Sequence, residues 1–205
     1  MSLKQYLQLS PSGSSSDRRL PACRYDVALA SNTFGTVHVC KFAKQCAHLK
    51  LLLHASTAYV AGKQKGRILE KPLQMGQALK KGRCIDIEAE LDLANDVKAK
   101  LVMARSGTDT SHQQLEKVAM KEIGLKRAKY FGWPNVYAFT KAMGEMLLGT
   151  MRGDLPVVIV RPSIVISTFQ DPFPGWIEGI RYLYECTLLF ASKEIYILYM
   201  YTRTG

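Results

Sequence analysis

The sequence predicts an α/β fold in which helices flank a parallel sheet. Two apolar runs, at residues 51–62 and 155–162, have the length and composition of buried strands. Segments with helical spacing lie before and between these runs, and no hairpin signal joins them. Because strands connected through helices make right-handed crossovers, we expect the two strands to lie parallel in one sheet.

Composition limits the protein classes, partners and metal sites that fit this chain. The chain has 205 residues, of which 47% are hydrophobic and 22% are charged, so it can form a core of domain size. Its net charge of +11 suits nucleic acid, an anionic membrane surface or a phosphate-rich small molecule. Since the basic residues are scattered rather than clustered, no nucleic-acid partner is expected. The five cysteines form no CxxC pair and the four histidines are dispersed, which predicts reduced intracellular thiols and no metal site.

The ends of the chain differ in composition from its middle. Residues 1–23 are rich in Ser, Pro and Gly, lack the apolar run of a secretory signal, and are expected to be a disordered leader. Residues 24–179 are expected to form the folded domain, and residues 180–205 a divergent tail. Charged residues interrupt the apolar stretch at residues 182–201, so a bilayer span is not expected, although peripheral membrane association stays open.

The first two elements are a helix and a strand. Residues 25–46 predict a long helix that bends near Gly35, with apolar residues at helical spacing, namely Val27, Val37, Phe42 and Ala43. Residues 51–62 predict a buried parallel strand that ends in hydroxyl residues and opens into a loop. The carboxyl end of such a strand is where α/β proteins place ligands.

Three helices and a second strand follow. Residues 85–101 and 113–127 predict amphipathic helices with solvated faces, rich in Glu and Lys. Residues 135–151 predict a further helix, which leads into the second buried strand at residues 155–162. A proline ends that strand.

A Tyr-x-x-x-Lys spacing occurs twice, at Tyr137…Lys141 and Tyr59…Lys63. On a helix this spacing places the ammonium one turn from the phenol, where its charge lowers the phenol pKa from about 10 toward the range of a general acid. The second copy follows a strand, where the chain turns, so we expect only Tyr137 and Lys141 to keep this geometry. The alternative is a partly buried tyrosine with an ordinary surface lysine.

Polar residues also end both predicted strands. Ser56 and Thr57 follow the first strand, where a hydroxyl could bond and polarise a substrate carbonyl. They could equally cap or turn the loop. Arg161, Pro162 and Ser163 end the second strand on the same edge of the sheet, where the backbone could meet a nicotinamide, or they could simply terminate the strand.

The order of these helices, strands and polar residues along the chain resembles that of the extended short-chain dehydrogenase/reductases. More closely, the chain resembles the plant alcohol-forming fatty acyl-CoA reductases of the male-sterility type, over about residues 24–179 and incomplete at both ends. The resemblance rests on five segments: 53–62, 85–90, 136–145, 160–165 and 171–179. It implies the catalytic part of a Rossmann-like reductase domain that lacks the first βαβ units.

The resemblance also implies a reaction. Such enzymes use NADPH to reduce a long-chain fatty acyl-CoA to a primary alcohol through an aldehyde, in wax, suberin or pollen-wall lipid metabolism. Tyr137 would donate the proton to the carbonyl oxygen, and Lys141 would lower its pKa and hold the nicotinamide ribose. Thr57 would orient the carbonyl, with Ser56 as the second choice.

Other implied features concern the cofactor and the location. Asn32 occupies the place of a helix asparagine that supports a proton relay beside the cofactor, although capping or a kink near Gly35 explains it equally well. No glycine-rich turn for the cofactor phosphates occurs in the sequence. Alternatives are a catalytically silent paralogue or partner subunit, or another extended reductase. Family members work at the endoplasmic reticulum or in plastids, and the former is expected here.

Overall fold

The structure is a computed structural model that describes residues 23–64, 66–103, 109–163, 169–170, 172–174 and 176. The chain divides into two compact units, residues 1–163 and 164–205. In the second unit, Trp176 N donates to Phe173 O at 3.2 Å. The expected leader, except Cys23, lies outside the described residues, as do the tail at 180–205 and part of the 171–179 segment. All other elements belong to the first unit.

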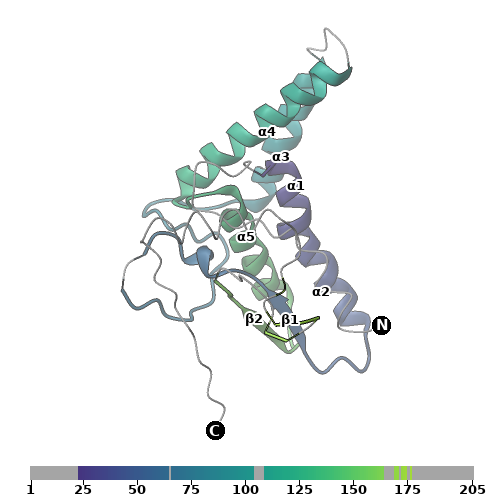
Figure 1. The fold of residues 1–205 in the computed structure, drawn as a ribbon, viewed down its shortest axis with the longest axis vertical. Coiled ribbons are helices and arrows are strands. Elements are labelled where there is room, and N and C mark those ends of the chain that lie inside the picture. Colours follow the sequence, from purple (N-terminus) through teal and green to yellow (C-terminus); the bar gives the residue numbers. More distant parts are fainter. Residues whose placement is uncertain are drawn as a thin grey trace. The chain divides into compact units, whose positions relative to one another are not determined.

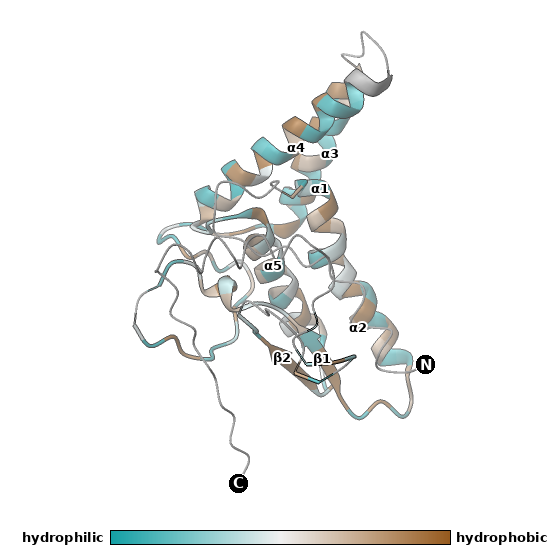
Figure 2. Ribbon diagram, viewed as in Figure 1, coloured by the Kyte–Doolittle hydropathy of each residue, from teal (hydrophilic) through white to brown (hydrophobic). Residues whose placement is uncertain are grey.

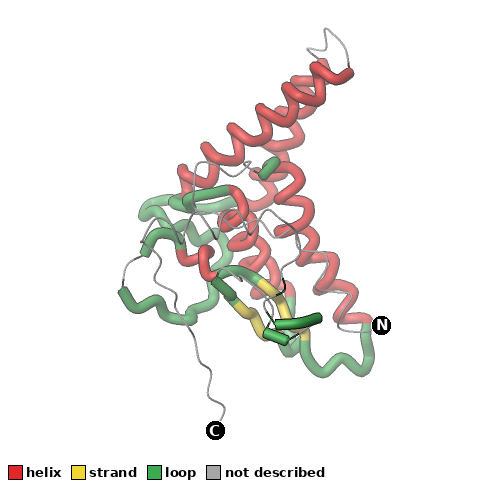
Figure 3. Tube along the Cα trace, in the orientation of Figure 1, coloured by secondary structure: helices red, strands yellow, loops and turns green. Residues whose placement is uncertain are grey.

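The first helical segment is long and continuous, as the sequence predicts (Figures 1 and 3). It comprises α1 (Tyr25–Ala28), the π-helix η3 (Leu29–Phe34) and α2 (Gly35–Gln45). The expected irregularity is therefore a wide π stretch that ends just before Gly35. Such stretches often accompany functional sites.

The apolar stripe predicted for this helix is wrong in part. Val27 and Phe42 are 48% and 46% exposed. Ala43 is buried as predicted, and the rest of the buried face combines apolar and polar side chains, namely Ala28, Leu29, Asn32, Thr33, Thr36 and Cys40. Polar residues are tolerated there because they find partners: Thr33 Oγ1 donates to Thr140 O at 2.9 Å.

The sheet of the described residues has two parallel strands, β1 (Leu52–Ala55) and β2 (Val157–Val160). Leu53 pairs with Val158, and the pairing continues past β1, where Ser56 N donates to Val160 O at 2.8 Å. Both strands are shorter than predicted, and β1 ends early because a 3-10 turn, η4 (Ala58–Ala61), follows it.

The expectation that both strands are buried is wrong for the described residues. Leu53, Val158 and Val160 are 43–49% exposed, and β2 is apolar throughout in Figure 2. These side chains share one face, because paired residues of parallel strands point the same way. On the other face, Leu52, His54, Val157 and Ile159 are half-buried.

Two long helices, α3 (Ile87–Met103) and α4 (Asp109–Phe131), run side by side beyond the sheet (Figure 1). Both were predicted: α3 lies two residues later than expected, and α4 extends beyond its expected bounds at both ends. Their solvated faces are confirmed, but Glu90 on α3 is buried and accepts from Tyr25 Oη at 2.6 Å and from Arg127 Nε at 3.0 Å. No helix among the described residues is both long and apolar enough to cross a bilayer.

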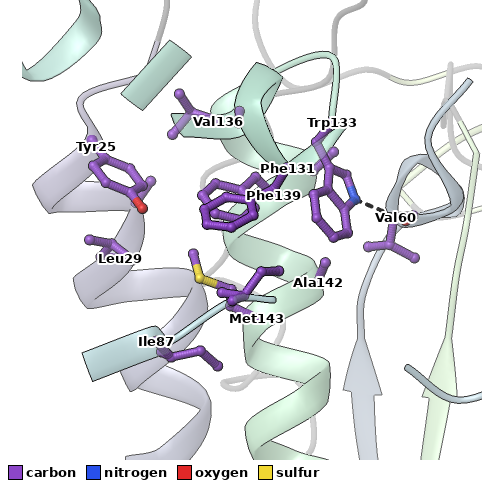
Figure 4. Packing of buried hydrophobic residues seen from close by; sticks show 14 of the residues in the cluster. Tyr25, Leu29, Val60, Ile87, Phe131, Trp133, Val136, Phe139, Ala142 and Met143 are labelled. Atoms are coloured by element: carbon purple, nitrogen blue, oxygen red, sulfur yellow. Dashed lines mark hydrogen bonds between the residues drawn. The ribbon is translucent and has the colours of Figure 1, made fainter. Parts of the chain in front are cut away.

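Helix α5 (Val136–Met151) is the centre of the unit, and it begins where the sequence predicts. Asn135 caps it by accepting from Ala138 N at 2.8 Å. Eleven of its sixteen residues are buried, because the first helix lies on one side and the strands on the other (Figure 4). An aromatic cluster of Phe131, Trp133 and Phe139 packs beside its first turns.

Gly144 sets how closely α5 approaches the first helix. A Cβ at this position would overlap the backbone oxygen of Asn32 and would lie 3.0 Å from Thr36 Oγ1. We expect Gly144→Ala to destabilise the protein by about 1–3 kcal/mol, because the helix backbones must separate. Gly149→Ala, in the same helix with open space around it, is the control and is expected to stabilise by about 0.5–1 kcal/mol. Urea unfolding of both variants measures this, and equal effects would contradict the close packing.

Candidate functional site

Tyr137 and Lys141 lie one turn apart on α5, as their spacing predicts. The Lys141 Nζ is 5.9 Å from the centre of the Tyr137 ring. Tyr137 is half-buried, whereas Lys141 is 4% exposed and its Nζ donates to Ala55 O at 3.1 Å. The ammonium therefore lies at the carboxyl end of β1, the edge where ligands bind in parallel sheets.

The charge of this buried ammonium depends on its surroundings. Burial holds the pKa of Lys141 below its ordinary value, and the Glu145 carboxylate opposes part of that effect. His54 on β1 has its pKa lowered to about 4, first by burial and then by the Lys141 charge. The imidazole is therefore neutral at pH 7, so it adds no second cation beside Lys141.

Ser56 and Thr57 are both buried at the end of β1 but differ in their bonding. Thr57 Oγ1 accepts from Tyr59 N at 3.3 Å and caps η4, which is the turn role considered from sequence. That contact orients the hydroxyl and leaves its hydrogen available to donate. Ser56 Oγ is buried with no hydrogen-bond partner among the described residues, so it too can meet a ligand.

The end of β2 lies beside the same loop. Ala58 N donates to Pro162 O at 2.9 Å, which joins the segments after the two strands. Arg161 is engaged internally: its Nε donates to Glu145 Oε1 at 3.0 Å, and its Nη2 to Glu145 Oε2 at 2.5 Å. The Arg161 guanidinium is therefore occupied by hydrogen bonds within the protein. Ser163 is exposed. Any contact of residues 161–163 with a cofactor would involve their backbone, as the sequence suggests.

Asn32 lies on the first helical segment, where it contacts α5. It is 5% exposed within η3, and its Nδ2 donates to Thr140 Oγ1 at 3.1 Å. The side chain thus joins the first helix to α5, one residue before Lys141. It caps no helix, and its proposed relay role stays a prediction.

The second tyrosine motif does not form a helical pair. Tyr59 lies in the 3-10 turn η4, and Gly62, with φ of +70°, separates it from Lys63. Lys63 is exposed. The expectation that only Tyr137 and Lys141 share an α-helical face is confirmed.

Two residues near Lys141 were not singled out as site residues from the sequence. Glu145 is 2% exposed and bonded to Arg161, and the Nε2 of His54 is buried with no hydrogen-bond partner in the described part of the chain. Glu145 could have been found, because it continues the i, i+4 stripe of Tyr137 and Lys141. His54 carried no such signal. Nor do the described residues group three or more His, Cys, Asp or Glu side chains as metal ligands would.

Comparison with known proteins gives a consistent result. Residues 22–204 match the NAD-binding family described as male sterility protein. Fatty acyl-CoA reductase 1 of Arabidopsis thaliana is 51% identical over 172 residues, which cover 84% of this chain and 34% of that protein. The alcohol-forming fatty acyl-CoA reductase of Simmondsia chinensis is 49% identical over 172 residues, with the same shares. Thus the chain spans about a third of the length of these curated relatives.

A third relative bears on location. Fatty acyl-CoA reductase 2, chloroplastic, of Arabidopsis thaliana is 46% identical over 173 residues, which cover 84% of this chain and 28% of that protein. The identity to this chloroplastic relative is close to that of the two reductases above.

Proposed function

The chain belongs to the NAD-binding family of male sterility proteins, and on that premise we propose that it carries the catalytic residues of an NADPH-dependent, alcohol-forming fatty acyl-CoA reductase. The observation that supports this most is the position of Lys141. Its ammonium is buried beside Tyr137 and bonded to Ala55 O at the carboxyl end of β1, and the hydroxyl of the following residue, Ser56, has no partner in the described part of the chain. Burying a cation is costly, which favours a functional reason for its place.

In this proposal Tyr137 donates its phenolic proton to the carbonyl oxygen of the substrate. The nearby Lys141 charge favours the phenolate that remains, so proton transfer becomes easier at neutral pH. Thr57, whose oxygen is fixed by Tyr59 N, donates a hydrogen bond to the same carbonyl oxygen and withdraws electrons from its carbon. Ser56 is the second choice for that role.

The described residues fit a nicotinamide cofactor at this edge of the sheet. An ammonium has three N–H donors, and Ala55 O takes one of those of Lys141. The remaining donors suit the hydroxyls of a ribose. The cofactor would supply hydride to the thioester carbon and then to the aldehyde carbon. We assign NADPH rather than NADH on the family resemblance, and the backbone of residues 161–163 as its neighbour at the end of β2.

We place the reaction at a membrane surface, because a long acyl chain and its alcohol product partition into lipid. The endoplasmic reticulum is favoured over the plastid on the family resemblance. A +11 net charge suits both the anionic acyl-CoA and an anionic bilayer.

The test measures fatty alcohol formed from NADPH and a series of acyl-CoA substrates with 16 to 24 carbons. Two proteins are assayed. One is the purified 205-residue chain. The other is a chimera in which residues 24–163 replace the matching segment of the Simmondsia reductase. Alcohol from either protein supports the proposal. If neither forms alcohol although both fold, the proposed function is wrong.

Substitutions can distinguish the contributions of the Thr57 and Ser56 hydroxyls to catalysis. We expect Thr57→Val to lower kcat about 10²-fold, since one donor to the developing oxyanion is lost. Thr57→Ser keeps the hydroxyl and should retain most of the activity. The matching variant Ser56→Ala is measured beside them, by alcohol formation in the active protein. A larger loss of kcat in Ser56→Ala than in Thr57→Val would assign the role to Ser56. Small losses of kcat in both variants would show that neither hydroxyl assists the reaction.

A further inference from the structure

Glu145 and Arg161 join the three segments that meet at the proposed site. Glu145 lies on α5, one turn beyond Lys141, and Arg161 directly follows β2. Both carboxylate oxygens accept from the guanidinium, at 3.0 Å and 2.5 Å. The Arg161 Nη2 also donates to Lys71 O at 3.2 Å, in the segment that follows β1 and η4.

This ion pair is buried on its acidic side. The Glu145 side chain is 1% exposed and that of Arg161 is 21% exposed. A buried carboxylate needs such a partner, because an unpaired one would be strongly destabilising. A buried ion pair adds little net stability compared with apolar residues of the same size, so its presence calls for a further role.

The charged and titratable groups around Lys141 are few among the described residues. Tyr137 and Glu145 flank it on α5, and His54 faces it from β1. Arg161 reaches the same region from the end of β2 through Glu145. Since His54 is neutral, Glu145 is the negative charge that acts on the ammonium, and Arg161 is the positive charge that moderates it.

We propose that Glu145 and Arg161 are positioning residues for Lys141: the shared carboxylate keeps the ammonium charged while leaving it bonded to Ala55 O beside Tyr137. An uncommitted carboxylate at i+4 would form its own ion pair with Lys141 and would draw it along the helix, away from β1. Without the carboxylate, burial would favour the neutral amine. The benefit of this arrangement rests on the proposed function, whereas the experiment that tests it requires no catalysis.

The test measures the titration of Lys141 by NMR in the full chain labelled with ¹³C at lysine. Loss of one resonance in Lys141→Met assigns the signal. We expect Glu145→Gln to lower the pKa of Lys141 by about one pH unit, because the attracting charge is gone. Arg161→Met should raise this pKa by a similar amount, because the carboxylate is no longer shared. The double variant should lie between the two.

The double variant also shows whether a pKa shift arises from unfolding rather than from the change in charge. Replacing both members of a buried pair by neutral residues of similar size is often harmless to stability, whereas each single change leaves an unpaired charge. Unfolding would move Lys141 toward its ordinary pKa in every variant. Shifts of opposite sign therefore support the inference. Shifts of the same sign, or no shift in either single variant while both remain folded, overturn it.

Failure of this inference differs from failure of the proposed function. The titration needs neither cofactor nor turnover. Opposite shifts without any fatty alcohol would leave the positioning role in place and reject the acyl-CoA reductase. Fatty alcohol from the wild-type protein with unchanged titration in the variants would retain the reductase and reject the positioning role.

Discussion

Replacement of Tyr137 by Phe is expected to lower kcat for fatty alcohol formation by about 10²–10⁴-fold, the usual contribution of a positioned general acid. The ring is retained, so its packing on α5 is preserved while the proton that would go to the substrate oxygen is lost. Binding of NADPH should change little, because Lys141 keeps its bond to Ala55 O at the end of β1. Stopped-flow turnover and fluorescence titration with NADPH measure the two effects separately.

Tyr59→Phe is the matched control. Tyr59 belongs to the other Tyr-x-x-x-Lys spacing, is half-buried like Tyr137, and lies in a 3-10 turn without a helical lysine partner. Burial raises its pKa, which opposes a role as an acid at neutral pH. We expect its loss to change kcat less than about threefold, because the phenol lacks a helical lysine that would favour proton transfer, and the backbone N–H that bonds Thr57 is kept. Comparable turnover in Tyr137→Phe and the wild-type protein would remove Tyr137 from the mechanism.

The largest expected effect on stability comes from Trp133. This side chain is 1% exposed, its ring centre is 5.4 Å from that of Phe139, and its Nε1 donates to Val60 O at 3.0 Å (Figure 4). It thereby ties the turn after β1 to the start of α5. Trp133→Ala should lower the free energy of unfolding by about 3–5 kcal/mol, since it leaves a cavity and an unbonded carbonyl.

Trp133→Phe separates the two contributions. It restores most of the apolar volume but cannot bond Val60 O, so we expect a loss of about 1–3 kcal/mol. Urea denaturation followed by circular dichroism gives both values. A loss below about 1 kcal/mol for Trp133→Ala would contradict the packing of this aromatic cluster, given the usual cost of such truncations.

Features set by neighbouring residues were predictable from the sequence. Helix α5 was predicted over residues 135–151, and the structure shows a helix there with the Asn135 side chain as its cap. The choice between the two tyrosine motifs also succeeded, because it depended on local signals, namely the helical context of Tyr137 and the turn after Tyr59. The parallel pairing of β1 and β2 followed from the helices that separate them.

Contacts between distant parts of the chain were not predictable in this way. Glu90 pairs with Tyr25 and Arg127, which lie 65 and 37 residues away in sequence. The Glu145–Arg161 pair spans 16 residues across a helix and a strand. No periodicity encodes such partners, because they depend on how the elements pack. For the same reason, Val27 was expected inside and lies outside.

We propose that hydride passes from NADPH to an acyl-CoA carbonyl at Tyr137 and Lys141. The decisive experiment combines NADPH that carries deuterium at C4 on the transferred face, a long-chain acyl-CoA, and mass spectrometry of the alcohol. We expect an alcohol with two deuterium atoms on its first carbon, lost together with turnover in Tyr137→Phe. Alcohol without deuterium, or unchanged labelled alcohol from Tyr137→Phe, would contradict it.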